Sequence, residues 1–204
     1  MNAMAQGFQR FSREVFPARA ALFEELATTH RPTALFIGCS DARVVPELIT
    51  QSDPGELFVI RTAGNLVPPY TRGPDGVAAS IEYAVDVLGV ADVVVCGHSA
   101  CGAMTALASG GDLTALPAVT TWLHHADASM ARTGAGGHPA GPERVAALVK
   151  DNVLAQLANL RTHPSVAKAL VQRKVTLHGW VYDIGSGSAE TLDTETGRFT
   201  ALAG

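Results

Sequence analysis

The sequence predicts an α/β protein with a mainly parallel central β-sheet, helices on both faces of the sheet and an N-terminal helical arm. Two patterns predict this class. Short runs rich in Val, Ile and Phe recur without polar alternation, which is typical of strands buried on both faces. Segments of helical periodicity separate these runs, as in proteins with parallel sheets. With 204 residues, 47% of them hydrophobic and 17% charged, the chain is expected to form a single domain, residues 1–204.

Residues 1–28 are predicted to form the helical arm. Phe8, Phe11 and Phe23 lie on apolar stripes of helical spacing, and Pro17 interrupts the stripes, which predicts two short helices. The apolar face either covers the arm's own core or packs against a second copy of the chain. The sequence leaves both arrangements open.

The remaining elements follow in alternation along the chain. Strands are predicted over four apolar runs, with a short last strand after the Gly-Ser stretch 185–188: residues 33–39, 56–63, 92–98 and 174–184. Helices are predicted where apolar residues recur every three or four positions: residues 44–51, 76–89 and 142–160. Thr133 to Pro142 is rich in Gly and Pro, which predicts a surface loop.

Composition excludes several classes of function. The formal net charge is −4 and no run of Lys or Arg occurs, so we expect no nucleic-acid partner. No apolar segment approaches the length of a membrane span, and the N-terminus lacks the features of a signal peptide, so we expect a cytoplasmic protein without a membrane partner. The three cysteines are Cys39, Cys96 and Cys101. An odd number argues against a disulfide framework and favours metal binding or catalysis, with Cys96 expected to be a small buried side chain inside its strand.

Metal-ligating residue types follow two of the predicted strands. Cys39, Asp41 and Arg43 form C-x-D-x-R after the first strand, and His98 and Cys101 form H-x-x-C after the third. Residues just beyond the carboxyl ends of neighbouring parallel strands converge, most usefully where the strand order reverses. Two thiolates and an imidazole form a ligand set that selects zinc. The sequence therefore predicts a zinc site at this edge of the sheet.

The paired motifs resemble those of the β-class carbonic anhydrases. The resemblance extends over almost the whole chain, including "PGELFVIRTAGNLVPPY", "SIEYAVDVLGV" and "QLANLRTHPSV", and is greatest to bacterial members encoded beside cyanate-degrading enzymes. It implies one Zn²⁺ per chain, with Cys39, His98 and Cys101 as ligands and Asp41 and Arg43 controlling acid and base at the metal. The implied reaction is the reversible hydration of CO₂ to bicarbonate and a proton through a zinc-bound hydroxide.

The resemblance also implies a narrow apolar pocket for CO₂. Phe58 and Tyr83 occupy the matching positions, and Tyr83 is expected to come from a second subunit, so the protein is expected to be a homodimer or a higher homo-oligomer. Plain core packing is the alternative for both aromatic residues. Gly102 is expected to let the backbone approach the site closely. His30 stands where related proteins have a glutamine that donates to substrate, so it is either a donor, a proton shuttle or simply exposed.

Two other functions fit part of the pattern. A structural zinc module would use Cys39, Asp41, His98 and Cys101 as four permanent ligands, without catalysis. An enzyme with the same fold could instead hydrolyse a CO₂ analogue such as COS or CS₂. Arg43 argues against the structural module, because its guanidinium competes with zinc for Asp41.

The resting state of the site is a further expectation. Some members of the family close the site with bicarbonate held by a tryptophan, an arginine and a tyrosine. Arg61 and Tyr182 occupy two matching positions, but Phe36 stands in place of the tryptophan and lacks its N–H donor. We therefore expect an open site at neutral pH, with Asp41 paired to Arg43, and no cooperative inhibition by bicarbonate; closure at low pH stays open as an alternative.

Overall fold

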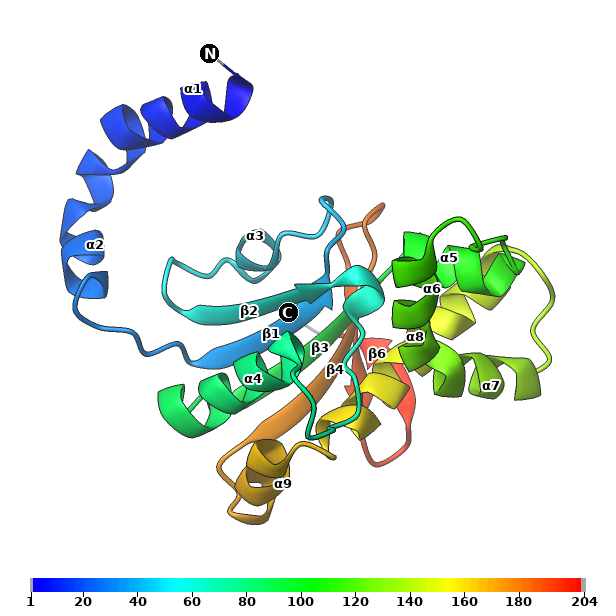
Figure 1. The fold of residues 1–204 in the computed structure, drawn as a ribbon. Coiled ribbons are helices and arrows are strands. Elements are labelled where there is room, and N and C mark those ends of the chain that lie inside the picture. Colours follow the sequence, from blue (N-terminus) through cyan, green and yellow to red (C-terminus); the bar gives the residue numbers. More distant parts are fainter. Residues whose placement is uncertain (1, 203–204) are drawn as a thin grey trace. The chain divides into compact units, whose positions relative to one another are not determined.

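The computed structural model describes residues 2–202, which divide between residues 31 and 32 into an N-terminal arm and an α/β unit (Figure 1). The arm contains two α-helices separated by a π-helical and a 3₁₀ segment: α1 Ala3–Arg10, η1 Phe11–Val15, η2 Pro17–Arg19 and α2 Ala20–Leu26. Within residues 2–202 there is no helix whose length and hydropathy would let it cross a lipid bilayer.

The arm has no buried residue in any of its helices. Asn2 caps α1, since its side chain accepts a hydrogen bond from the amide of Ala5. Pro17 stands at the first position of η2, where its missing N–H is not needed. The rings of Phe16 and Phe23 stack with centroids 5.3 Å apart. The arm therefore holds an aromatic cluster that is only partly covered by its own residues.

The α/β unit is built on one six-stranded sheet in the order β2-β1-β3-β4-β5-β6. Its strands follow the predicted apolar runs, with two short strands at the end: β1 Ala34–Cys39, β2 Leu57–Thr62, β3 Asp92–His98, β4 Thr176–Tyr182, β5 Ala189–Asp193 and β6 Arg198–Ala201. The first four strands are mutually parallel, whereas β5 and β6 are antiparallel additions. A mainly parallel sheet is thus confirmed.

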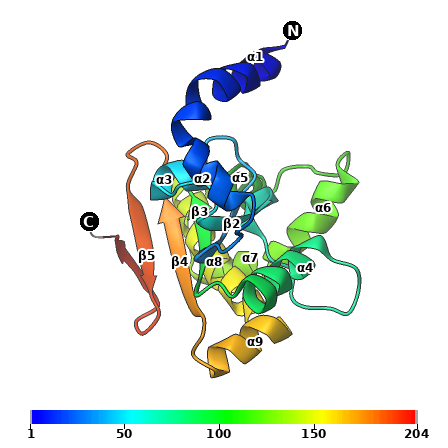
Figure 2. The same ribbon diagram turned by 90° about the vertical axis from the view of Figure 1, so that its left-hand side faces the viewer.

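Helices cover both faces of the sheet (Figures 1 and 2). They and the short helical segments occupy the following ranges: α3 Pro46–Thr50, η3 Ala63–Asn65, α4 Gly76–Glu82, η4 Tyr83–Leu88, α5 Gly102–Ser109, α6 Pro117–Leu123, η5 His124–Ala126, α7 Asp127–Ala135, α8 Pro142–Leu160 and α9 Pro164–Val171.

The main hydrophobic core lies between the sheet and α8, α9 and α4. Alternate residues of β1, such as Leu35 and Ile37, point into this core, while Phe36 points to the other face. There Phe36 packs with Cys96, Ile49 of α3 and Trp180. Burial on both faces explains why the β1 and β3 sequences are continuously apolar.

The sheet order reverses between β1 and β3. From β1 the chain passes to β2 on one side, and then crosses back to β3 on the other side of β1. The carboxyl ends of β1 and β3 therefore adjoin a crevice of the kind that holds ligands in open α/β sheets. Cys39 ends β1 and His98 ends β3, so the sheet itself brings the two motifs together.

Two details differ from the sequence prediction. The hairpin strand β6 was not predicted, because "RFTA" is short and has no clear apolar alternation. The surface loop begins later than predicted, since α7 continues through Ala135. The helix predicted over residues 142–160 agrees with α8, and the helix predicted over 76–89 is divided into α4 and η4.

Candidate metal centre

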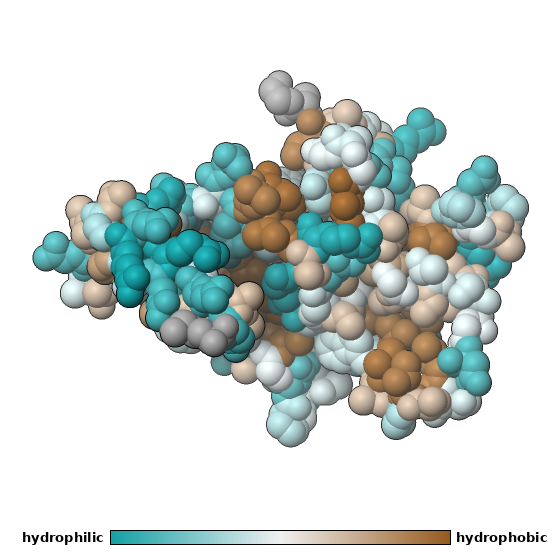
Figure 3. Space-filling view, turned by 90° about the horizontal axis from the view of Figure 1, so that it is seen from above, coloured by the Kyte–Doolittle hydropathy of each residue, from teal (hydrophilic) through white to brown (hydrophobic). Residues whose placement is uncertain are grey.

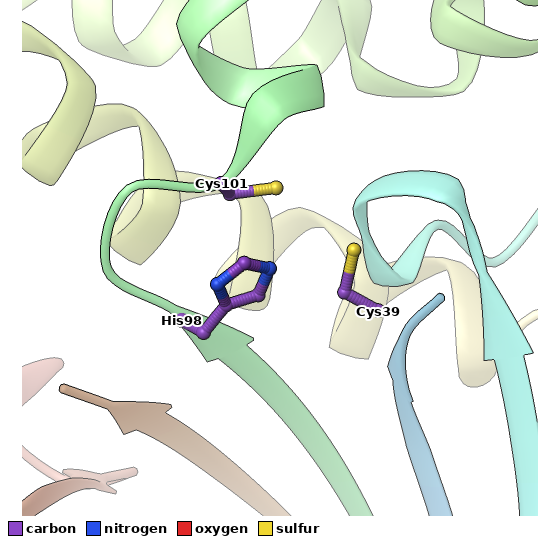
Figure 4. Close-up of side chains that lie close together, drawn as sticks. All are labelled: Cys39, His98 and Cys101. Carbon is purple, nitrogen blue, oxygen red and sulfur yellow. The ribbon is translucent and has the colours of Figure 1, made fainter. Parts of the chain in front are cut away.

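Three side chains that can bind a metal converge at the switch point of the sheet (Figure 4). One sulfur each from Cys39 and Cys101 and a ring nitrogen of His98 all lie within 4.8 Å of one another, and all three residues are buried. Cys39 is the last residue of β1, His98 the last of β3, and Cys101 the N-cap of α5. Each ligand thus stands on the end of a regular element that is fixed by the core.

The tautomer of His98 suits metal binding. Its Nδ1 lies 2.9 Å from the carbonyl oxygen of Ser99, and because a carbonyl can only accept, Nδ1 must carry the proton. The other nitrogen, Nε2, is buried and has no hydrogen-bond partner. An unpaired buried nitrogen is costly unless a ligand uses its lone pair. A metal-ligating histidine is expected to donate from one ring nitrogen to a carbonyl and to present the other to the metal. Nδ1 and Nε2 of His98 are arranged in this way.

The surroundings favour the thiolate form of Cys39 but not that of Cys101. A hydrogen bond from Cys101 lowers the pKa of Cys39 to about 4, and the same contact raises the pKa of Cys101. Backbone amides also donate to each sulfur, those of Asp41 and Gly64 to Cys39 and those of Met104 and Ala103 to Cys101. The thiolate is the form of cysteine that binds metals, so the donor set of two sulfurs and one imidazole fits Zn²⁺.

Asp41 lies beside the cluster but is paired with Arg43. Nε and Nη2 of Arg43 donate to the two carboxylate oxygens at 2.9 and 2.7 Å, and the Arg43 amide donates to Oδ1 at 3.0 Å. These bonds hold the pKa of Asp41 well below its usual value, and the carboxylate in turn raises the pKa of Arg43. Asp41 Oδ2 is 3.9 Å from Nε2 of His98. Both oxygens are engaged by Arg43, so the geometry offers three metal ligands rather than the four of a structural module.

The loop that carries His98 and Cys101 is anchored to the end of β4. The amide of Ser99 donates to the carbonyl of Tyr182, and the amide of Ile184 donates to the Ser99 hydroxyl, both at 2.9 Å. Ala100 adopts a left-handed conformation with φ of 52°. Its carbonyl accepts a hydrogen bond from Nη2 of Arg43 at 3.1 Å. Arg43 therefore links the two motifs directly.

The turn after β2, η3, forms a third side of the centre. It contacts β1, β3 and α5, the three elements that supply the ligands. Gly64 in this turn has φ of 71°, and an added Cβ would lie 3.0 Å from Met104 and 3.1 Å from Ala103. Only glycine combines this conformation with so close an approach to α5. The Gly64 amide can consequently reach the sulfur of Cys39.

Helix α8 holds this turn with a row of side-chain amides. Asn152 donates to the carbonyl of Gly64 at 2.9 Å, Gln156 accepts from the amide of Val67 at 2.9 Å, and Asn159 donates to the carbonyl of Val67 at 2.8 Å. The sequence interpretation missed these residues. The signal was available, because these polar residues recur at intervals of four and three positions on the side of α8 that also carries buried apolar residues.

The predicted pocket aromatics lie elsewhere in the chain's own fold. Phe58 and Tyr83 contact each other, with ring centroids 6.1 Å apart. Phe58 pairs with Leu35, four positions before Cys39 in the register, which places its backbone about 13 Å from the metal end of the strand. Tyr83 is 44% exposed. Within one chain, neither residue is brought to the metal cluster by its strand or helix.

Gly102 and His30 have different surroundings. Gly102 opens α5 beside Cys101, and a Cβ there would meet nothing within 4 Å. The space next to Cys101 is therefore open in the chain itself, and the expected close backbone approach at Gly102 stays a prediction. His30 is exposed and belongs to the arm.

Cys96, His124 and His178 have contacts that do not involve the metal cluster. Cys96 is 1% exposed, and burial raises the pKa of its thiol to about 12. His124 lies 3.3 Å from Asp127, and His178 lies 2.7 Å from a carboxylate oxygen of Asp92. Among the described residues, the cluster of Cys39, His98 and Cys101 is the group of three or more such side chains that could hold a metal ion.

Comparison with known proteins points to one family. A family model described as carbonic anhydrase matches residues 34–189. A carbonic anhydrase of Pseudomonas aeruginosa is 60% identical over 203 residues, which cover 100% of this chain and 92% of that protein. Carbonic anhydrase 1 of Escherichia coli O157:H7 is 55% identical over 203 residues, covering 100% of this chain and 93% of that protein.

Solved structures agree with the sequence relatives. The β-carbonic anhydrase CcaA superposes with a TM-score of 0.94 at 39% identity, over 98% of this chain and 91% of that one. A structure from a study of two tetrameric β-carbonic anhydrases of the ascomycete Sordaria macrospora superposes with a TM-score of 0.82 at 29% identity, over 98% of this chain and 95% of that one. The similarity thus extends over residues of both the arm and the α/β unit.

Proposed function

The chain belongs to the β-class carbonic anhydrases and catalyses the reversible hydration of CO₂, and from this premise we propose which of its residues carry out the reaction. The reaction consumes CO₂ and water and releases bicarbonate and a proton. Its requirements are a metal that activates water, a group that orients the attacking oxygen, and space for an apolar substrate. The residues around the metal centre meet the first two requirements.

We propose that Cys39, His98 and Cys101 hold one Zn²⁺ per chain. The observation that supports this most strongly is the pairing of a buried, partnerless Nε2 on His98 with two sulfurs within 4.8 Å. When bound, Zn²⁺ supplies Lewis-acid activation that brings the pKa of water toward neutrality. The Ser99 carbonyl fixes the His98 tautomer, and backbone amides fix the two sulfurs.

Asp41 is proposed to orient the attacking water. Its carboxylate stays ionised because Arg43 donates to both oxygens, and it faces the cluster with Oδ2 3.9 Å from His98 Nε2. A carboxylate in this position accepts a hydrogen bond from the O–H of the water and turns an oxygen lone pair toward the carbon of CO₂. Arg43 holds Asp41 away from the metal position, so that water has access to it.

The test compares cysteine variants of the same chain. Wild-type protein purified without chelator is expected to contain about one zinc per chain and to hydrate CO₂ in a stopped-flow assay. Cys39→Ser and Cys101→Ser should lose both zinc and activity. Cys96→Ser is the matched control, because Cys96 is buried like the other two but lies outside the cluster. Zinc retention and activity in Cys39→Ser would refute the proposed ligand set.

A second copy of the chain is proposed to complete the substrate pocket. The rings of Phe58 and Tyr83 contact each other at a distance from the metal cluster of their own chain. If these two residues line the CO₂ pocket, they must therefore line the pocket of another subunit. Exposed apolar side chains support association, among them Phe8 at 70% exposure in the arm and Val87 at 65% in the α/β unit. Figure 3 shows separate hydrophobic areas on the face seen from above. We propose a homodimer as the minimal unit, with tetramers as in the Sordaria relatives as the next state.

The compartment and physiological role are also proposals. All three cysteines are free, and a zinc site with two thiolates needs a reducing compartment to load, which supports the cytoplasm. The expected relation to cyanate metabolism stays a prediction, and the activities encoded by neighbouring genes would test it. His30 is proposed as a donor to bicarbonate, and a His30→Ala variant with unchanged KM would contradict that role.

A further inference from the structure

Arg61 of β2 makes three hydrogen bonds to the turn that carries Cys39 and Asp41. Its Nε donates to the carbonyl of Cys39 at 3.0 Å, and its Nη2 donates to the carbonyls of Asp41 at 2.6 Å and Val44 at 2.7 Å. Every one of these acceptors is a backbone oxygen of the segment between the end of β1 and the start of α3. A single guanidinium thus binds this turn at three points.

The position of Arg61 in the sheet makes this contact possible. In the register of β1 and β2, Arg61 lies opposite Gly38, one residue before Cys39. The strands continue to pair just past this point, since the amide of Ser40 donates to the carbonyl of Thr62 at 2.9 Å. Beyond Ser40 the ladder ends, and the turn has to be fixed by other groups. The long, planar side chain of Arg61 reaches past the end of the ladder to do this.

Beyond Ser40, whose amide bonds to Thr62 of β2, the other hydrogen bonds described for this turn do not reach β2. Arg43 belongs to the same turn as Asp41, so their ion pair sets the direction of the carboxylate but not the position of the turn on the sheet. The hydrogen bond from the amide of Val44 to the carbonyl of Asp41, at 3.0 Å, is also internal to the turn. The bond from Arg43 to Ala100 connects the turn with the loop after β3. The side chain of Arg61 connects the turn after β1 with β2, on the other side of β1 from β3.

We propose that Arg61 is a positioning residue that holds Asp41 at its working place beside the metal. Arg43 fixes the carboxylate of Asp41, and Arg61 fixes its carbonyl, so the residue is held from the side chain and from the main chain. Arg61 also fixes the carbonyl of the ligand Cys39. This role differs from the bicarbonate contact implied by the family resemblance, because Nε and Nη2 of Arg61 are occupied by the protein's own backbone.

The inference rests on the proposed roles of Cys39 and Asp41, and its test separates the two. Wild-type protein that lacks zinc and CO₂ hydration would overturn the proposed function. If the wild type has both, the variants Arg61→Ala and Arg61→Lys test the inference alone. Arg198→Ala is the matched control, because it removes an exposed arginine from β6 at the far edge of the same sheet.

Arg61→Ala is expected to lower kcat about 10- to 100-fold, with KM within about twofold of wild type, because a displaced catalytic group slows the chemical step. The kcat of Arg61→Lys should also stay below about a tenth of the wild-type kcat, because the ammonium group of lysine cannot bind three carbonyls in fixed directions. Guanidinium at millimolar concentration should raise the kcat of Arg61→Ala severalfold, while methylammonium at equal ionic strength should not. Rescue of this kind would not occur if Arg61 only stabilised the fold.

Metal binding gives a readout that does not depend on activity. Competition with a chromophoric chelator is expected to show weaker zinc binding in Arg61→Ala, by about 10-fold or more, and Co²⁺ in the site should give a shifted visible spectrum. Guanidinium should restore both. Unchanged kcat, zinc affinity and Co²⁺ spectrum in Arg61→Lys would overturn the inference. Loss of a bicarbonate effect in Arg61→Ala with unchanged kcat would overturn it in favour of an anion-binding role.

Discussion

Asp41 and Arg43 differ in exposure and in their contacts with the metal cluster. The carboxylate of Asp41 is only 17% exposed and contacts both the guanidinium and the edge of the metal cluster, whereas the side chain of Arg43 is half exposed. Asp41 can therefore accept a hydrogen bond from a water at the centre, and Arg43 cannot. In the proposed mechanism, Asp41 is the hydrogen-bond acceptor at the site and Arg43 holds Asp41 in place.

Asp41→Asn is expected to keep zinc and lose catalysis. The ligand cluster does not include Asp41, so metal analysis should give the wild-type zinc content. An amide cannot act as an acceptor with both of its terminal atoms, and kcat should fall about 100-fold or more. Asp127→Asn, which changes an exposed carboxylate on α7, should leave kcat unchanged. Full activity of Asp41→Asn in stopped-flow assays would contradict the orienting role.

Ala100 lies in the metal loop with a conformation that suits another residue type. A φ of 52° is unfavourable for alanine, and asparagine tolerates it better at a single position. Ala100→Asn is expected to raise the free energy of unfolding by about 1 kcal/mol, and the thermal midpoint by about 2–4 °C. The same change at Ala128, exposed in helix α7, should lower the midpoint, because asparagine is a poorer helix former. A lower thermal midpoint for Ala100→Asn would show that the left-handed conformation of residue 100 does not limit the stability of the protein.

At the scale of elements, α8 is both a core helix and a support for the site. Its apolar residues Val153 and Leu157 lie in the core against the sheet, while Asn152 and Gln156 are fully buried and bind backbone groups of the turn after β2. A buried amide is tolerated when its hydrogen-bonding groups are satisfied. Gln156 also donates to the side chain of Asn152 and to the carbonyl of His125.

Gln156→Leu is therefore expected to be strongly destabilising although leucine fits a core. The change would remove the acceptor of the buried Val67 amide and the side-chain donor to the His125 carbonyl, at a cost of about 3 kcal/mol. Urea unfolding of the zinc-loaded protein measures it. Gln172→Leu, at the exposed end of α9, is the control and should change stability by less than about 0.5 kcal/mol. Equal stability of the two variants would mean that the amide row has no structural role.

The β4–β5 connection gives a pH-dependent contribution to stability. Hydrogen bonds from the amide and hydroxyl of Ser186, followed by one from Ser99, lower the pKa of Asp183 below its usual 3.8. A carboxyl with a lower pKa in the folded chain contributes stability that is present above the unfolded pKa and is lost as pH falls through the folded pKa.

Asp183→Asn should consequently flatten the acid side of the stability profile. Thermal midpoints measured from about pH 6 down to about pH 3 are expected to fall less steeply in the variant than in the wild type. The control Glu195→Gln removes an exposed carboxylate from the next hairpin and should leave the wild-type slope unchanged. Identical slopes for Asp183→Asn and wild type would contradict the role of this turn.

At the scale of the whole molecule, the features predicted correctly from the sequence are those set by the fold of a single chain. The strand ends bearing Cys39 and His98 were expected to meet because parallel strands end at a common edge, and the sheet order confirms the switch point between β1 and β3. The role of Arg61 was not predictable from the sequence, because it depends on where a turn lies past the end of the ladder. The proposed place of Phe58 and Tyr83 beside the metal requires a second subunit, and no pattern within one chain specifies how two subunits pack.

Removal of residues 2–28 is expected to disrupt both assembly and activity. The arm buries none of its helical residues on its own, and apolar side chains such as Phe8 would be covered in an oligomer. Light scattering should give a smaller mass for the truncated chain than for the full chain, and kcat should fall in parallel. Phe8→Ser in the full chain is expected to weaken association in the same direction. A truncated chain of unchanged mass and activity would contradict the assembly proposal.

The wide separation of Cys39 from His98 and Cys101 along the chain has a consequence for biosynthesis. No continuous stretch of the emerging polypeptide contains the site, so zinc cannot template folding as it does in a short zinc finger. The site exists only after β1 has paired with β3, a contact between distant parts of the chain that forms slowly. The proposed zinc is thus expected to bind after folding, so protein stripped with a chelator should be folded and inactive. Addition of Zn²⁺ alone should restore its activity, without synthesis of new protein.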